Sequence, residues 1–383
     1  GFDVVIANPP YVRIFKQGQN GDIKDVFKRI YKSAYKDYDY YVLFMEKGIN
    51  ILRYNGILTY ITPDKYLVRE YGSKIREIIF RYSIKQLFDI SRANDIFEAA
   101  TYPLITIIQK NNLTNEINVK IAKTIQSLEH DYKEISIAKQ QCLNNNRIEI
   151  VDPEFNALIN KIFSQATYKL SEMLSPAQIF CGTPRAKDYH LWSKYISEKK
   201  KKNCLRVLVC SNITPYTIKY GKKVRVTGLS ISSPYFFNED EVISKTRWED
   251  FKFVPKIIIR GNDTRITAAL DEEGSVFIGI YGIKIEDNIT QEYKTLLACL
   301  NSKLYQWIFT IQNPSIKIGG EFFSINSPHI LRLPYKKPSA KQKQNIDTIV
   351  DKIHALTKSD DYLQKQSKQS KVKEYETEID QLF

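Results

Sequence analysis

This chain of 383 residues has few features that would cross-link it or anchor it. No Cys-x-x-Cys pair occurs, and no histidine stands at ligand spacing from a cysteine. We therefore expect neither a disulfide framework nor a metal site, and the reducing cytoplasm as the location. No apolar run approaches about 20 residues, and no basic-then-apolar leader is present, so membrane anchoring and secretion are not expected. The cysteines are Cys142, Cys181, Cys204, Cys210 and Cys299.

Acidic residues are in deficit, with 43 Asp and Glu against 57 Lys and Arg, which gives a formal net charge of +14. Such a balance favours a polyanionic partner. A basic protein without such a partner remains the alternative on charge alone. The hydrophobic content of 43% predicts a folded protein rather than a disordered one.

The first hundred residues alternate strand-like and helix-like stretches, which predicts an α/β domain with a central, largely parallel sheet. Residues 2–7 (FDVVIA) are expected to form a buried strand that ends at Asn8-Pro9-Pro10-Tyr11. Asn55-Gly56 is expected to end a helix over 38–54. A last strand over 102–109 could lie antiparallel at the end of the sheet. The remaining expected elements are strands over 57–61 and 84–90 and a helix over 73–80.

Four segments are expected along the chain. The first, 1–112, is the α/β part, and 113–166 is a polar connecting region with some helix. Short strands separated by turns predict a mostly β or α+β domain over 167–335, with a helix over 296–309. The strands are expected over 207–210, 224–226, 256–260, 266–270 and 276–280. Helical spacing of Ile346, Ile349, Val350, Ile353 and Leu356 predicts one or two amphipathic helices in 336–383.

The Asn8-Pro9-Pro10-Tyr11 string carries the chemistry. An exocyclic amine on a purine is a poor nucleophile, because its lone pair is delocalised into the ring. Two acceptors, the Asn8 side-chain oxygen and the Pro9 carbonyl, could hold its hydrogens and turn the lone pair toward a methyl donor. Tyr11 could stack on a base flipped out of a duplex. The alternative is a rigid turn in which Tyr11 only packs.

This motif after FDVVIA resembles the catalytic motif of N6-adenine DNA methyltransferases of the TaqI and type IIG restriction-modification families. The similarity continues through residues 38–47, 56–67 and 95–107. It implies a partial Rossmann-like methyltransferase sheet, S-adenosylmethionine as cofactor and double-stranded DNA as partner. By this resemblance Phe97 helps to hold the flipped adenine, and Asn8 and Phe44 lie beside the cofactor.

Gly228 and residues 256–261, 300–304 and 331–334 are similar to landmarks of the family's target-recognition domain. Basic residues recur among turns and aromatics there, as phosphate and base contacts require, although each one singly could be a solvated surface charge. The candidates for DNA binding are Arg185, Lys187, Lys222, Lys223, Arg225, Arg247, Arg260 and Arg265. The run Lys199 to Lys202 and Lys219 accompany them.

The family's glycine-rich turn for the methyl donor is missing, since no Gly-x-Gly follows a strand in the first hundred residues. We therefore expect the main cofactor motif outside this chain, in an N-terminal remainder of the same enzyme, and an inactive fragment on its own. Two alternatives stay open. One is a DNA-recognition module without catalysis, and the other is an amide-N methyltransferase that acts on protein.

Overall fold

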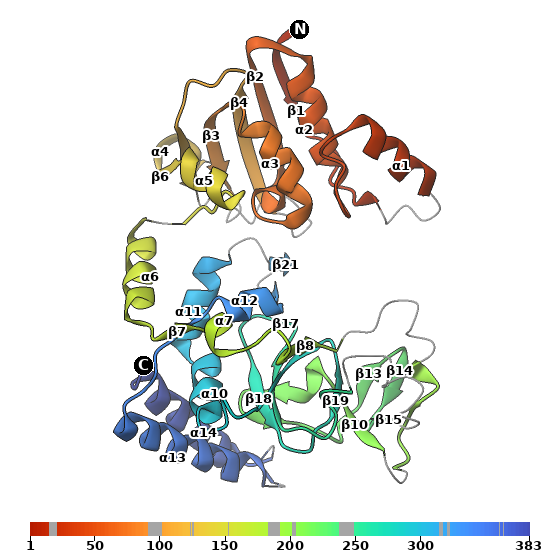
Figure 1. The fold of residues 1–383 in the computed structure, drawn as a ribbon, viewed down its shortest axis with the longest axis vertical. Coiled ribbons are helices and arrows are strands. Elements are labelled where there is room, and N and C mark those ends of the chain that lie inside the picture. Colours follow the sequence, from red (N-terminus) through yellow and green to blue (C-terminus); the bar gives the residue numbers. More distant parts are fainter. Residues whose placement is uncertain are drawn as a thin grey trace. The chain divides into compact units, whose positions relative to one another are not determined.

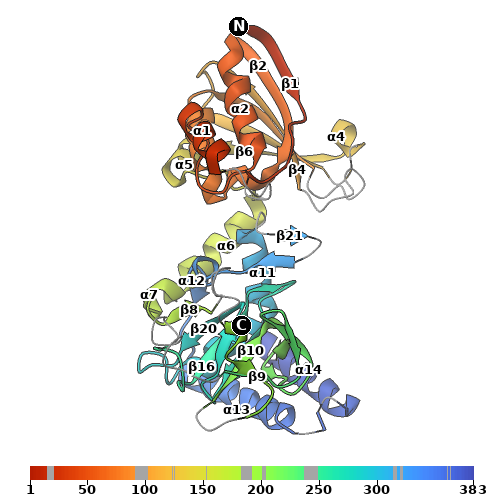
Figure 2. The same cartoon turned by 90° about the vertical axis from the view of Figure 1, so that its right-hand side faces the viewer.

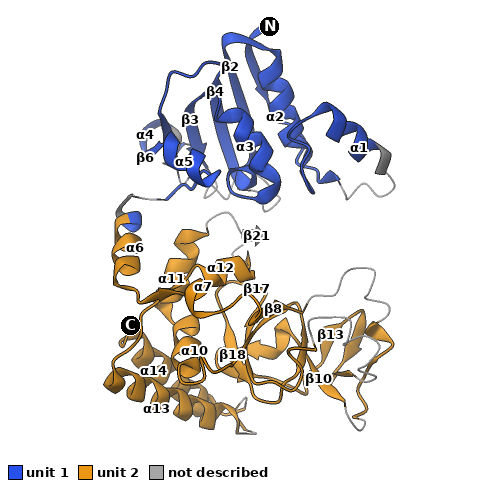
Figure 3. Ribbon diagram, viewed as in Figure 1, with its two compact units in different colours: residues 1–156, 314–320 blue, residues 157–313, 321–383 orange. Residues whose placement is uncertain are grey.

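The computed structural model describes residues 1–14, 21–90, 102–122, 124, 126–151, 153–182, 192–200, 204–236, 249–313, 317–319, 322–359, 361–362 and 364–383. The chain divides into two compact units (Figure 3). Unit 1 comprises Gly1–Asn156 and Pro314–Gly320, and unit 2 comprises Ala157–Asn313 and Glu321–Phe383. The division falls inside helix α6 (Pro153–Gln165).

Unit 1 is built on a six-stranded sheet with the order β1-β2-β4-β3-β5-β6. Strands β1 and β2 are parallel, as are β3 and β5, whereas β4 is antiparallel to both β2 and β3. The fold is therefore α/β, and the antiparallel last strand lies inside the sheet rather than at its end. The strands are β1 (Phe2–Ala7), β2 (Leu52–Pro63), β3 (Ser83–Asp89), β4 (Pro103–Gln109), β5 (Glu116–Ala122) and β6 (Tyr132–Ala138).

Helices α2, α3 and α5 cover one face of this sheet (Figures 1 and 2). Figure 1 shows α2 and α3 in front of the strands, and the turned view in Figure 2 shows α2 and α5 to one side of them. Apolar side chains such as Leu58 and Leu104 point to that face and form the core with the helices. The helices are α1 (Gly21–Ile30), α2 (Tyr40–Ile51), α3 (Ser73–Ile79), α4 (Ser127–His130) and α5 (Lys139–Asn145), with 3-10 turns η2 (Asp64–Leu67) and η3 (Glu70–Gly72).

Strand β1 has the expected bounds, but the expectation that it is buried is wrong. Phe2, Val4 and Ile6 are 62%, 52% and 74% exposed. Within the described residues β1 is hydrogen-bonded to β2 alone, and no helix covers its outer face. Only Val5 and Ala7, which point the other way, pack against the core.

Two other expectations for unit 1 are corrected. Helix α2 ends at Ile51, and Asn55 takes a left-handed φ of 64° within β2, where the register with β1 shifts. Part of the connecting region over 113–166 joins the sheet as β5 and β6. Its alternation buries Ile117, Val119 and Ile135 while polar residues face solvent, so the polar composition concealed two strands near the sheet edge.

Unit 2 contains two four-stranded sheets, β19-β10-β15-β9 and β18-β16-β20-β8, and several two-stranded ribbons. The expected strand over 276–280 is two strands, because Gly279 has a φ of 70°. The strands are β7 (Tyr168–Lys169), β8 (Ile179–Cys181), β9 (Ile196–Ser197), β10 (Leu205–Val209), β11 (Ile213–Thr214), β12 (Thr217–Ile218), β13 (Val224–Val226), β14 (Leu229–Ile231), β15 (Tyr235–Phe236), β16 (Lys256–Arg260), β17 (Asn262–Asp263), β18 (Ala268–Asp271), β19 (Val276–Ile278), β20 (Ile280–Lys284), β22 (Phe322–Ser324) and β23 (Pro334–Tyr335), and residues 314–320 of unit 1 include β21 (Lys317–Gly319).

Helices complete unit 2. The single helix expected over 296–309 is two, because the Ser302 hydroxyl accepts a hydrogen bond from the Tyr305 amide and begins a new helix. The amphipathic helices expected near the end are α13, which buries Ile346, Ile349, Val350 and Ile353, and α14, which buries Val372 and Ile379. The helices are α7 (Leu170–Met173), α10 (Tyr293–Asn301), α11 (Lys303–Gln312), α12 (Ser327–Leu331), α13 (Ala340–Thr357) and α14 (Gln366–Asp380), with a 3-10 turn η5 (Cys210–Asn212).

Candidate active site and basic hairpin

The Asn8-Pro9-Pro10-Tyr11 loop follows the carboxyl end of β1. Ala7 is paired with Tyr60 of the parallel strand β2, and the Tyr11 hydroxyl oxygen lies 3.1 Å from the carbonyl oxygen of Ile61. The loop therefore lies where two parallel strands end together, the edge at which open α/β sheets place their ligands.

Within the loop, Asn8 is exposed, Pro9 is buried and Tyr11 is half-buried. The Tyr11 hydroxyl donates to Asn8 Oδ1 at 2.6 Å, which fixes the direction in which the amide oxygen points. Burial raises the pKa of Tyr11 above its ordinary value, so the phenol is protonated and a donor at neutral pH. An amide oxygen has two lone pairs, so Asn8 keeps the capacity for a second donor.

The buried side chain of Tyr41 packs against Tyr11. The Tyr41 ring meets the Tyr11 ring edge-on, with centroids 6.3 Å apart and planes at 86°. The Tyr41 and Tyr71 hydroxyls are 2.7 Å apart, and Tyr71 donates to Asp39 Oδ2 at 2.9 Å. Burial raises the pKa of both Tyr41 and Tyr71 well above the ordinary value, which keeps this chain of phenols protonated.

Main-chain bonds tie the loop to the start of α2. The Tyr40 amide donates to the Val12 carbonyl at 3.0 Å, and the Ile14 amide donates to the Tyr38 carbonyl at 3.2 Å. No sequence pattern connects Asp39 and Tyr71 with the loop, because Tyr71 is 60 positions away from Tyr11. Only the tyrosine-rich run around residue 40 beside the motif could have suggested an aromatic support.

The two phenylalanines predicted for the site have different outcomes. Phe44 is 45% exposed, although most of its neighbours in α2 are buried, so it points away from the sheet core. Its place beside a cofactor stays a prediction. Phe97 falls within 91–101, outside the described residues.

Three of the eight predicted DNA-binding residues lie together. Lys222 and Lys223 precede β13, Arg225 lies within it, and all three are exposed. Elsewhere, Arg260 is half-buried and pairs with Asp263 at 3.2 Å. Burial raises the pKa of Glu376 in α14, and the charge of Arg265 opposes this shift. Arg185, Lys187 and Arg247 lie outside the described residues, as do Lys201 and Lys202.

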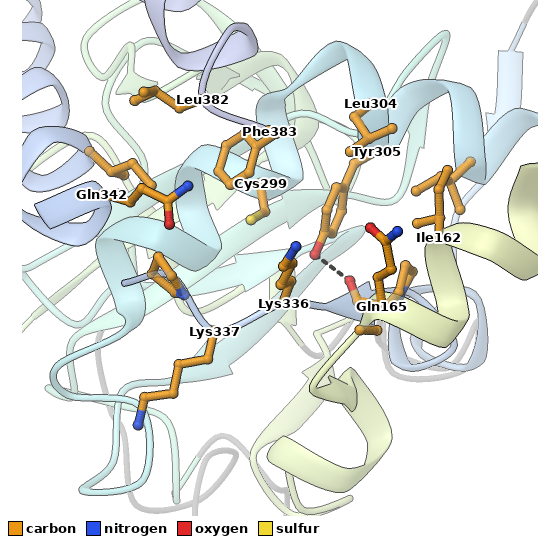
Figure 4. Close-up of a pocket in the computed structure, with 15 residues that line it drawn as sticks. Ile162, Gln165, Cys299, Leu304, Tyr305, Lys336, Lys337, Gln342, Leu382 and Phe383 are labelled. Carbon is orange, nitrogen blue, oxygen red and sulfur yellow. Dashed lines mark hydrogen bonds between the residues drawn. The ribbon is translucent and has the colours of Figure 1, made fainter. Parts of the chain in front are cut away.

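A cavity of about 220 Å³ lies in unit 2 between α6, α10, α11 and the residues before α13 (Figure 4). Its lining is mostly apolar and includes Lys336 and Lys337 but no acidic residue and no histidine. Burial raises the pKa of the Cys299 thiol to about 12, so this sulfur is not a nucleophile at neutral pH. The Tyr305 hydroxyl in the same wall donates to the Pro334 carbonyl. Neither the Cys299 thiol nor the Tyr305 hydroxyl is therefore available as a nucleophile in this cavity.

In the part of the chain that the structure describes, no cluster of three or more His, Cys, Asp or Glu side chains could hold a metal ion. None of the five cysteines forms a disulfide bond. None of the helices described is both long and apolar enough to cross a membrane.

Two family models match the chain. Residues 1–97 match the Eco57I restriction-modification methylase, and residues 205–334 match the TaqI-like C-terminal specificity domain. The first match contains the Asn8–Tyr11 loop, and the second contains the β13–β14 ribbon.

Individual relatives agree with these matches. The chain is 27% identical over 202 residues to RM.Eco57I of Escherichia coli, a type II restriction enzyme and methyltransferase, and this covers 51% of the chain and 20% of the relative. It is 24% identical over 363 residues to RM.MjaORFECS2P of Methanocaldococcus jannaschii, which covers 92% of the chain and 29% of the relative. The chain thus spans less than a third of either.

Among solved structures, the Type IIL restriction-modification enzyme MmeI in complex with DNA matches with a TM-score of 0.51 and 12% identity. This match covers 99% of the chain and 53% of MmeI. At this identity the match supports the fold alone.

Proposed function

We propose that this chain is part of an enzyme that methylates adenine N6 in double-stranded DNA. The chain belongs to the type II restriction-modification methyltransferases and carries their specificity domain. The target adenine is flipped into a pocket at the Asn8–Tyr11 loop. The observation that carries the proposal is the exposed Asn8 amide, whose oxygen is oriented by Tyr11 at 2.6 Å.

In this proposal the side chains hold and orient the amine. Asn8 Oδ1 and the Pro9 carbonyl accept the two N6 hydrogens, which turns the nitrogen lone pair out of the ring plane. Pro9 and Pro10 stiffen the loop, so little freedom is lost on binding. Tyr11 stacks on the extruded base together with Phe97, and Tyr41 holds Tyr11 in place through the edge contact.

S-adenosylmethionine would supply the methyl group as a sulfonium. From this chain, Asn8 and the exposed Phe44 could face it, and a ring 45% exposed on a helix is suitable for stacking. No Gly-x-Gly turn follows a strand in unit 1. We therefore propose that these residues contribute only part of the cofactor site, and that the chain alone is inactive.

An N-terminal remainder of the same enzyme is the proposed partner of unit 1. The relatives are far longer than the region that they share with this chain. Phe2, Val4 and Ile6 form an exposed apolar face on a strand with an unpaired edge, as described above. Such an edge and such a face are usually covered in stable proteins, and a polypeptide that supplies the cofactor motif would cover both.

Double-stranded DNA is the proposed substrate, and unit 2 is the proposed recognition domain. The net charge of +14 favours a polyanion, and the exposed cluster Lys222, Lys223 and Arg225 offers contacts to it. The other predicted contacts, from Arg185, Lys187, Arg247, Arg260 and Arg265, remain part of the proposal.

The test combines the chain with the polypeptide encoded upstream of it and measures methyl transfer from S-adenosylmethionine to duplex DNA. Digestion to nucleosides and mass spectrometry should identify N6-methyladenine. Asn8→Ala should lower kcat at least about 100-fold, since it removes an acceptor that acts on the reacting nitrogen. Tyr11→Phe should lower it less, because the stacking ring stays and only the bond to Asn8 is lost.

Asn50→Ala is the matched control, because Asn50 is exposed in the same unit and should leave kcat unchanged. Methyl groups on glutamine of a protein substrate instead of on DNA would replace the proposal by an amide methyltransferase. DNA binding without methyl transfer in the combined protein would leave only a recognition module. An Asn8→Ala variant as active as wild type would remove the proposed role of this loop.

A further inference from the structure

The segment from Lys199 to Asn238 contains no acidic residue but nine basic ones. Glu198 precedes it and Glu239 follows it. Forty consecutive residues without Asp or Glu are unusual in a chain that has 43 of them among 383 residues. The basic residues are Lys199, Lys200, Lys201, Lys202, Arg206, Lys219, Lys222, Lys223 and Arg225.

The middle of this segment is a β-hairpin formed by β13 and β14. Val226 is paired with Leu229, so Thr227 and Gly228 alone make the turn. Their φ angles are 45° and 88°, both left-handed, as in the tight turn that suits the twist of a hairpin. A Cβ placed on Gly228 would meet no atom within 4 Å, so the tip extends into open space.

The two faces of the hairpin differ sharply. Val224, Val226 and Ile231 point inward and belong to a core cluster with Val207 and Val209 of β10. On the outer face Arg225 stands directly opposite Ser230, and both are exposed. The hairpin is therefore anchored by one face and presents an arginine and a hydroxyl side by side on the other.

Arg225 also differs from the neighbouring arginine of the same segment. Arg206 pairs with Glu273 and lies over the Tyr220 ring at 4.3 Å. For Arg225, Lys222 and Lys223, no ion pair forms with any residue that the structure describes. Three cationic side chains on or next to the anchored hairpin thus indicate an anionic partner outside the chain.

We infer that the β13–β14 hairpin enters the major groove of DNA and that Arg225 reads the edge of a guanine, while Lys222 and Lys223 contact phosphates beside it. This inference rests on the proposed function, because it takes duplex DNA as the substrate. A two-stranded ribbon fits the major groove, which is about 12 Å wide, and not the minor groove of about 6 Å. The planar fork of arginine presents two parallel donors in the geometry of guanine O6 and N7, whereas the lysine ammonium is a point charge without a fixed fork.

The test selects duplexes from a randomised DNA pool with the 383-residue chain and compares the enriched motifs. Wild type should enrich a motif that contains guanine at one position with a preference of tenfold or more. Arg225→Gln should lose that preference or move it to adenine, for which glutamine has the matching donor and acceptor. Arg225→Lys keeps the charge but replaces the planar fork by a single ammonium, so it should still bind DNA while its preference for guanine weakens, which guards against a folding defect in the first variant.

Phosphate contacts are separated from base reading by salt dependence. The double variant Lys222→Ala/Lys223→Ala should enrich the same motif, but the slope of log K against log salt should become shallower by about 2. The Arg225 variants should leave the slope nearly unchanged. Lys341→Gln, a charge change on the exposed start of α13, is the control that should alter neither motif nor slope.

Two results would overturn the inference. If Arg225→Gln and Arg225→Lys both enrich the wild-type motif, the hairpin does not read a base, and the proposed methyltransferase function is untouched. If wild type enriches no motif from duplex DNA, the inference fails together with the proposed DNA substrate.

Discussion

Strands β1 and β16 have similar apolar runs but opposite surroundings. Residues 2–7 read FDVVIA and residues 256–260 read KIIIR. In β16, Ile257, Ile258 and Ile259 are fully buried, because β18 and β20 pair with both edges. In β1, Ile6 is 74% exposed and β2 is the one described neighbour. The comparison teaches that an apolar run predicts a strand, whereas its neighbours decide whether the strand is buried.

The charged residue of each strand shows the same contrast. Lys256 Nζ lies 3.2 Å from Asp271 Oδ2, and both side chains are almost completely buried. Asp3 pairs with Arg53, and more than half of each side chain is exposed. A buried charge that loses its partner cannot be solvated by water, whereas an exposed one can.

The largest effect is expected from the buried pair. Asp271→Asn leaves the Lys256 ammonium without its counter-charge and should lower the free energy of unfolding of unit 2 by about 3–5 kcal/mol. All three tryptophans of the chain, Trp192, Trp248 and Trp307, fall within unit 2. Urea unfolding followed by tryptophan fluorescence therefore reports on this unit.

The control for this pair is Arg53→Ala, which should leave the unfolding of unit 1 unchanged when it is followed by circular dichroism. If Asp271→Asn were as stable as wild type, burial would not be what distinguishes the two strands.

A smaller effect is expected from matched isoleucines. Ile258→Ala should lower the free energy of unfolding of unit 2 by about 2–5 kcal/mol, because it removes buried methylene groups and leaves a cavity. Ile6→Ala removes the same atoms from an exposed position and should cost far less. Urea unfolding measures the first, and hydrogen exchange of β1 and β2 amides measures the second. An Ile6→Ala variant as unstable as Ile258→Ala would mean that β1 is covered in solution, for example by a second copy.

The smallest effect is expected from His354 in α13, through the pH dependence of the stability of unit 2. Burial lowers the pKa of His354 in α13, and the Lys358 charge adds to this, while Glu272 and Asp351 act against it. Below pH 6.5 the unfolded chain binds a proton that folded His354 resists, so the stability of unit 2 should fall as the pH falls through this range. His354→Gln should flatten the dependence, as measured by urea midpoints between pH 7.5 and 5. The same pH dependence in His354→Gln would contradict this assignment.

Local patterns predicted much of the fold. The observed bounds of β1, β13 and β16 are the predicted ones, because proline, glycine and β-branched residues mark strand ends. The break at Ser302 and the strands β5 and β6 were missed, since a capping hydroxyl and a polar edge strand look like ordinary helix and linker residues. Burial of β1 was mispredicted, because it depends on neighbours that no local pattern specifies.

The candidate site was predictable only in its contiguous part. Four adjacent residues identified the Asn8–Tyr11 loop, but the support from Tyr41, Tyr71 and Asp39 depends on contacts between residues about 30 positions apart. Likewise, no sequence pattern distinguishes the eight basic residues predicted to bind DNA from one another. The structure separates Arg225, with no ion pair among the described residues, from Arg260, which pairs with Asp263.

The position of β4 has a consequence for the order in which unit 1 can fold. Residues 103–109 hydrogen-bond to both β2 and β3, which come earlier in the chain. During synthesis, β2 and β3 each keep an unpaired edge until β4, the strand that pairs with both, has left the ribosome. Strand β4 therefore joins two earlier strands from between them, a non-local pairing that slows folding, before β5 and β6 extend the sheet. A nascent chain stalled before residue 103 would be exposed to mispairing and capture by chaperones.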